Sequence, residues 1–165
     1  MEKKVEEEVV VDFEGTNNIP STNYEKILVP EDSYNCEVKS IAVIQVPDYD
    51  NPSQKVTKLA IECELLEGSQ KGKEIAHLLF PKITKASANR GGKVYSNSKL
   101  FDLLVDLGLH DEAKERKEEL KTIDGLRLFL SANLVGKTVR CAIGTSKRGK
   151  PEAYSMIKKV LRFVE

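Results

Sequence analysis

The sequence has no tryptophan and few other aromatic residues, with five Tyr and five Phe among its 165 residues. Any binding site therefore has few rings on which a nucleic-acid base can stack. Only three cysteines are present, Cys36, Cys63 and Cys141, and they lie far apart within runs rich in Val, Ile and Leu. We therefore expect buried thiols in strands, with no disulfide and no metal bound by cysteine.

Long apolar segments are also missing. No run approaches the roughly 18 residues that a membrane helix needs. The N-terminus, Met1–Glu8, lacks the apolar core of a signal peptide. We expect a cytoplasmic protein with no membrane partner, and 165 residues are enough for one domain with its own core.

The chain has no net charge, but the two signs are sorted along it. Residues 71–99 carry seven Lys/Arg and one acid, and residues 136–165 carry eight Lys/Arg and two acids, so each block has a net charge of +6. Residues 1–33 carry −6, and residues 34–70 and 100–135 carry −3 each. This sorting indicates a surface that meets an anion, and a polyanion accounts for two basic blocks better than a small ligand does.

Apolar alternation predicts three strands in the first half of the chain. The first covers residues 34–46, with a change of phase in its middle that is typical of a bulge or a sharp bend. A second strand covers residues 58–65, and the turn at 67–72 leads to a third at 73–80. The third strand has no clear phase, because both of its faces are apolar. These hairpins predict an antiparallel meander.

The middle of the chain is helical in pattern, from about residue 96 to 134. Leucines from Leu100 to Leu107 share one face, with Ser96 or Ser98 as the N-cap and Gly108 at the end. Residues 111–121 are strongly charged and predict an exposed helix.

A further short helix is expected at 126–134. Strands at 138–143 and 153–164 follow it, joined by the basic loop 144–151.

Three strands, helices and two more strands give a mainly β fold with helices. This order is the layout of the oligonucleotide-binding (OB) fold, a five-stranded Greek-key barrel, with a helical insertion between strands three and four. We expect the OB-fold domain to cover residues 28–165 and residues 1–27 to form an acidic, flexible N-terminal arm. The main alternative is an open α+β sheet in which the same segments pair differently.

Short motifs strengthen this interpretation. They are Pro30-Glu31-Asp32-Ser33-Tyr34, Leu66-Glu67-Gly68 with Lys71-Gly72-Lys73, Leu107-Gly108-Leu109, and Leu134-Val135-Gly136-Lys137. With these spacings, residues 28–164 resemble the phage-type single-stranded-DNA-binding proteins of the OB fold. The resemblance implies a phage or mobile-element protein of the host cytoplasm that works with replication or recombination proteins. The charged segment 110–124 is longer than the usual connection of that family, and the family's usual tryptophan is missing.

In such a barrel the ligand crosses strands two and three, between the loops that join strands one to two and four to five. Those loops are 47–55 and 144–151 here. Cations in them can follow phosphates while a ring stacks on a base. The candidate residues of this region are Tyr49, Lys55, Lys58, Arg140, Lys147, Arg148, Lys150 and Tyr154.

The segment from Lys82 to Tyr95 is a second candidate. It is too long and polar for a tight connection, and its glycines allow close approach of a ligand to the backbone. Its candidate residues are Lys82, Lys85, Arg90, Lys93 and Tyr95.

Catalytic patterns are missing from the sequence. His77 and His110 are isolated, and no Cys or carboxylate lies at metal spacing from them. The pairs Asp48/Asp50 and Glu62/Glu64 resemble a nuclease site only superficially, because Glu62 and Glu64 alternate with core residues. We expect no enzyme, no cofactor and no metal.

The sequence therefore predicts a non-catalytic single-stranded-DNA-binding protein that acts in DNA replication, recombination or repair. Two alternatives remain open. A protein-interaction OB module would use the basic blocks to dock an acidic partner, and a single-stranded RNA binder would use the same cations and rings.

Overall fold

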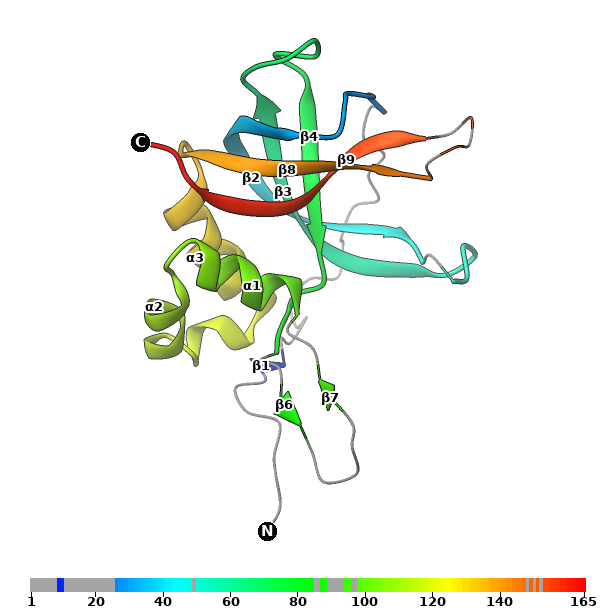
Figure 1. Ribbon diagram of the computed structural model, residues 1–165. Coiled ribbons are helices and arrows are strands. Elements are labelled where there is room, and N and C mark those ends of the chain that lie inside the picture. Colours follow the sequence, from blue (N-terminus) through cyan, green and yellow to red (C-terminus); the bar gives the residue numbers. More distant parts are fainter. Residues whose placement is uncertain are drawn as a thin grey trace.

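The computed structural model describes residues 9–10, 26–48, 50–84, 87–88, 94–95, 98–147, 149, 151 and 153–165. Its main feature is a five-stranded antiparallel sheet in the order β4-β3-β2-β8-β9 (Figure 1). The strands are β2 (Ser33–Pro47), β3 (Lys55–Leu65), β4 (Glu74–Leu79), β8 (Thr138–Ser146) and β9 (Tyr154–Phe163). The predicted mainly β fold, with three strands before the helical segment and two after it, is confirmed.

The sheet is not closed by backbone pairing into the predicted barrel, because its ladder ends at β4 on one side and at β9 on the other. These two edge strands nevertheless contact each other. A side chain joins them, since Nδ1 of His77 in β4 lies 3.1 Å from the carbonyl oxygen of Ile157 in β9. The predicted Greek-key barrel is therefore not confirmed: the sheet is open, and its two edge strands touch.

The first long strand is bent as its apolar phase predicts. Pairing between β2 and β3 shifts between Val38 and Ser40, which makes Lys39 an extra residue. Because of this bulge, Val38 and Ile41 are both buried although they are three positions apart. The start of β2, Ser33–Glu37, pairs with β8, and Cys36–Pro47 pairs with β3, so Cys36 and Glu37 pair with both strands.

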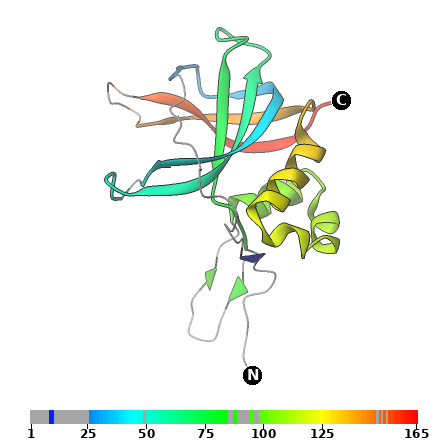
Figure 2. The same cartoon turned by 180° about the vertical axis from the view of Figure 1, so that it is seen from behind.

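The helical segment lies at one end of the sheet (Figures 1 and 2). The predicted helix at Leu100–Leu107 is confirmed as α1 (Lys99–Asp106), with Ser98 rather than Ser96 as its N-cap. The single exposed helix predicted at 111–121 is wrong, because the chain forms α2 (His110–Glu115) and then the 3-10 helix η1 (Glu119–Lys121). The turn between them carries Leu120 into the core, where it is 1% exposed.

The last helix, α3 (Ile123–Leu134), begins three residues before the predicted start. Its N-cap is Thr122, whose hydroxyl accepts a hydrogen bond from the backbone N–H of Gly125 at 3.0 Å. α3 packs against β2, and α1 packs against β9. Their fully buried leucines, each worth about 1.5–3 kcal/mol by burial, are Leu100, Leu104, Leu126, Leu130 and Leu134.

Four short strands lie outside the main sheet. β1 (Val9–Val10) pairs with β5 (Lys82–Ile83), and β6 (Ser87–Ala88) pairs with β7 (Val94–Tyr95). The prediction of an irregular loop from Lys82 to Tyr95 is therefore wrong in part, since three short strands lie in it. Of the acidic arm predicted at 1–27, only residues 9–10 and 26–27 are among the described residues.

Across the described residues, no helix combines the length and the apolar character needed to cross a membrane.

Candidate nucleic-acid interface

The outer face of β3 and β4 is divided into an acidic end and a basic, aromatic end. Cross-strand pairing places Glu64 opposite Glu74, and Glu62 follows on the same face of β3. Further along this face, beyond the Ala60–Leu78 pair, come Lys58 and Phe80. A polyanion would be repelled by the three carboxylates, so only the end with Lys58 and Phe80 suits one.

Phe80 is an exposed ring beside a cation. Its side chain is 58% exposed although it directly follows a core strand, and Nζ of Lys58 lies 4.5 Å from the ring centroid. An exposed ring can stack on a base, and a nearby ammonium group can bind the phosphate next to that base. These two residues therefore form the geometry that single-strand binding needs.

A second lysine raises the positive potential at this point. Burial lowers the pKa of Lys58 from 10.5, and the charge of Lys99 at the start of α1 lowers it further, while Asp48 raises it. Lys58 is therefore held near a like charge that a bound anion would offset. Lys82 is also near, because its backbone N–H donates to the carbonyl oxygen of Phe80 at 2.8 Å. We call Lys58, Phe80, Lys82 and Lys99 the Phe80 cluster.

Sequence reasoning named Lys58 and Lys82 but missed Phe80 and Lys99. The phase of the third strand was ambiguous, so Phe80 was not assigned to either face. The structure resolves this phase, because Ile75, His77 and Leu79 are buried and Phe80 is exposed. Lys99 was counted in the basic block 71–99 without a place in space.

The two hairpins expected to flank the ligand project from the same side of the sheet (Figures 1 and 2). The β2–β3 hairpin carries Lys55 at the start of β3, where it is exposed. The β8–β9 hairpin carries Lys147, which is exposed and has a φ of 54°. A non-glycine residue in this left-handed conformation stores strain, of the kind found at functional positions.

Tyr154, at the start of β9, is half-buried and already has a cation beside it. Nζ of Lys26 lies 5.3 Å from the centre of the Tyr154 ring. Residues around Lys26 are fixed to β9, since the backbone N–H of Ser155 donates to the carbonyl oxygen of Ile27 at 2.7 Å. Stacking of a base on Tyr154 would therefore have to displace Lys26.

Arg140, one of the candidate cations, is engaged in a partly exposed ion pair within the protein. Its guanidinium donates to a carboxylate oxygen of Glu67 at 2.8 Å and to the side-chain oxygen of Asn35 at 3.0 Å. These contacts tie the β3–β4 turn to β8. Because Glu67 offsets its charge, Arg140 contributes less to an anion site than an unpaired arginine would.

The structure does not describe the side chains of the other predicted residues. Tyr49, Lys85, Arg90, Lys93, Arg148 and Lys150 lie outside the described residues. Tyr95 is described only as part of β7, where it pairs with Ser87. The β6–β7 pair lies below the helices in Figure 1, away from both long hairpins. The β6–β7 part of the second predicted region is therefore distant from the hairpins, whereas Lys82 at its start lies near Phe80 and Lys58.

The histidines and cysteines make contacts within the fold. His77 is 3% exposed, and the His110 ring packs edge-on against Phe101 with 4.9 Å between ring centroids. The three cysteines are buried and free, as predicted. A hydrogen bond with Cys141 and burial raise the pKa of the Cys36 thiol, so it stays protonated. Within the described part of the chain, no three His, Cys, Asp or Glu side chains are grouped as metal ligands.

Comparison of the chain with protein-family models, curated proteins and solved structures finds no significant match.

Proposed function

We propose that this chain is a non-catalytic single-stranded-DNA-binding protein built as an OB-fold barrel. It serves DNA replication, recombination or repair, and a phage or mobile element encodes it. The DNA strand crosses β3 and β4 at the Phe80 cluster and continues between the β2–β3 and β8–β9 hairpins.

The sheet supports the OB part of this proposal. Its strand order, the bent β2 that pairs with both β3 and β8, and the helices between β4 and β8 are features of that barrel. In a closed barrel the third and fifth strands meet, and here the corresponding β4 and β9 are joined through His77 and Ile157.

The single observation that carries the binding proposal is the exposed Phe80 ring with Lys58 at 4.5 Å. Lys58 covers the ring in the free protein. When a base stacks on the ring, Lys58 moves to the neighbouring phosphate, where its ammonium also gains an opposite charge. Stacking and phosphate contact are tolerant of sequence, so binding depends little on base identity.

The test is a fluorescence titration of labelled oligo-dT with the full chain and with Phe80→Ala. Loss of one stacking ring costs about 1–3 kcal/mol per base, so Kd should rise about 5- to 150-fold. Leu128→Ala is the matched control, because Leu128 is 54% exposed on α3, a helix that packs against β2. The control should bind as the native chain does.

Two results would contradict the proposal. One is no binding of oligo-dT at low salt, and the other is equal affinity for the native chain and Phe80→Ala. Competition by an RNA oligomer of matched sequence separates DNA from RNA binding. We expect DNA to compete better, and an RNA preference would change the proposed ligand while keeping the same cluster.

A further inference from the structure

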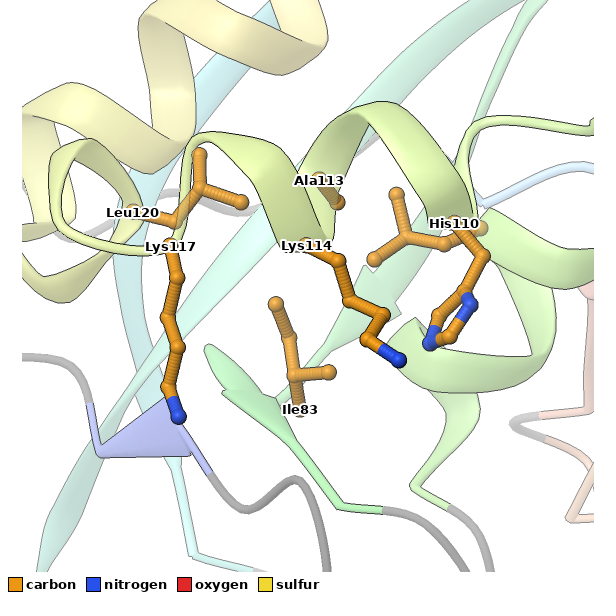
Figure 3. Close-up of a pocket in the computed structure, with 7 residues that line it drawn as sticks. Ile83, His110, Ala113, Lys114, Lys117 and Leu120 are labelled. Carbon is orange, nitrogen blue, oxygen red and sulfur yellow. The ribbon is translucent and has the colours of Figure 1, made fainter.

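A small apolar cavity lies between β5 and the helical segment, and no residue of the Phe80 cluster lines it. It has a volume of about 90 Å³, which is less than the roughly 150 Å³ of a cavity that holds benzene. Its residues are Ile83, Leu104, His110, Ala113, Lys114, Lys117 and Leu120 (Figure 3). A cavity of this size and composition fits one aliphatic side chain, and it is too small for a cofactor.

The rim of the cavity is basic. Figure 3 shows the side chains of Lys114 and Lys117 extending in the same direction, with Ile83 between them and His110 at one side. An aliphatic side chain that enters here therefore suits a peptide whose neighbouring residues are acidic.

The strand beside the cavity already accepts an added strand. β5 pairs antiparallel with β1, with Val9 opposite Ile83 and Val10 opposite Lys82. β1 also contacts η1, which carries Leu120 of the cavity wall. A segment that adds to the edge of β5 thus runs directly past the cavity. In strand addition of this kind, backbone hydrogen bonds hold the peptide and pockets select its side chains.

The chain's own segment that supplies residues 9–10 has an acidic and aliphatic sequence. Three valines, residues 9–11, follow three glutamates at 6–8 and precede Asp12 and Glu14. Aliphatic residues flanked by carboxylates complement an apolar cavity with a lysine rim.

We infer that the edge of β5 and the adjoining cavity form a docking site for an extended acidic-aliphatic segment of a partner protein. The chain's own residues 9–10 occupy this edge until the partner displaces them. The site shares Lys82 of β5 with the Phe80 cluster, but the inference rests on strand addition and on the cavity and does not depend on DNA binding.

The test uses a fluorescein-labelled synthetic peptide with the sequence of residues 5–14 and measures its anisotropy with the full chain in the absence of nucleic acid. Val9→Pro with Val10→Pro weakens the internal strand, because proline cannot donate a backbone hydrogen bond. The internal segment competes at a high effective concentration, so this variant should bind the peptide roughly tenfold more tightly than the native chain.

Two further comparisons test the site itself. Lys114→Glu with Lys117→Glu should weaken peptide binding at least roughly tenfold by reversing the rim charge, while the matched control Lys137→Glu with Lys158→Glu should not. A peptide with its acidic residues replaced by Gln and Asn should also bind more weakly.

Several outcomes would overturn the inference. They are no peptide binding by the proline variant at about 1 mM, equal binding of the neutral peptide, or unchanged binding by the Lys114/Lys117 variant. If the native chain forms dimers that the proline variant lacks, the occupant is a second copy of the chain, and the partner-protein inference is wrong.

Discussion

Replacing His77 with asparagine should remove a loss of stability that the native protein undergoes in mild acid. His77 is buried in β4, and its Nδ1 lies 3.1 Å from the Ile157 carbonyl oxygen in β9. Because a carbonyl oxygen only accepts, Nδ1 is the nitrogen that carries the proton. Burial lowers the pKa of His77 from 6.5 to about 4, and the charge of Lys99 adds to this, while the bond to Ile157 opposes it.

The direction of the effect follows from the two pKa values of His77. Above pH 6.5 the ring is neutral in both the folded and the unfolded chain, so the free energy of unfolding does not depend on it. Between pH 6.5 and about 4 the unfolded chain takes up the proton and the folded chain does not. Stability therefore falls as the pH falls, by about 2 kcal/mol at pH 5 and about 3 kcal/mol in full.

The assay is urea unfolding of the native chain and of His77→Asn at pH 7 and pH 5. Asparagine does not titrate, and its side-chain N–H can still donate to Ile157. All other titrating groups are common to both proteins, so the difference between the two pH dependences isolates His77. Native protein should lose about 2 kcal/mol more than the variant. Parallel pH dependences would refute the buried, neutral His77 ring.

Two other predictions concern Ser98 and Lys147, single residues within the two basic blocks. Ser98→Ala should cost about 1–2 kcal/mol of stability, because the Ser98 hydroxyl accepts hydrogen bonds from the N–H of Phe101 at 3.1 Å and from that of Thr84 at 3.0 Å. Urea unfolding should show Ser98→Thr to be more stable than Ser98→Ala, and equal stability would count against this cap. Lys147→Gly should leave the melting temperature unchanged or slightly higher, because glycine relieves the left-handed strain of about 1 kcal/mol. The same variant should bind oligo-dT several-fold more weakly, and unchanged affinity would exclude Lys147 from the interface.

Strand positions could be predicted because each depends on local alternation. The bulge in β2 was visible as a change of phase, since the residues on both sides of Lys39 must face the same core. Whether the sheet closes into a barrel could not be predicted. It depends on how β4 and β9 meet, and these strands are about 80 residues apart in sequence. The break between α2 and η1 was missed for a related reason, because burial of Leu120 in the core ends the helix although its charged residues would allow it to continue.

Prediction of the candidate site was limited in the same way, by contacts between segments that are distant in sequence. Charged residues in loops were easy to list, but Arg140 is engaged by Glu67, a residue 73 positions away. The Phe80 ring was missed because the phase of the third strand must be known before the exposure of Phe80 can be predicted. Contacts between distant segments thus decide which cations and rings are available to a ligand.

The sorted charge of the sequence has a measurable consequence once the folded positions are known. Lys71 and Lys73 lie at the acidic end of the β3–β4 face, beside Glu74, whereas Lys58, Lys82 and Lys99 lie near Phe80.

Each phosphate contact on a single strand contributes about −0.7 to the slope of log K against log salt. Three contacts give a slope of about −2, and a few more from the β8–β9 hairpin give about −4. If the seven and eight Lys/Arg of the two basic blocks all met the strand, the slope would approach about −10. Titration of oligo-dT at four salt concentrations distinguishes these cases, and a slope near −10 would mean that the strand follows the basic blocks rather than the Phe80 cluster.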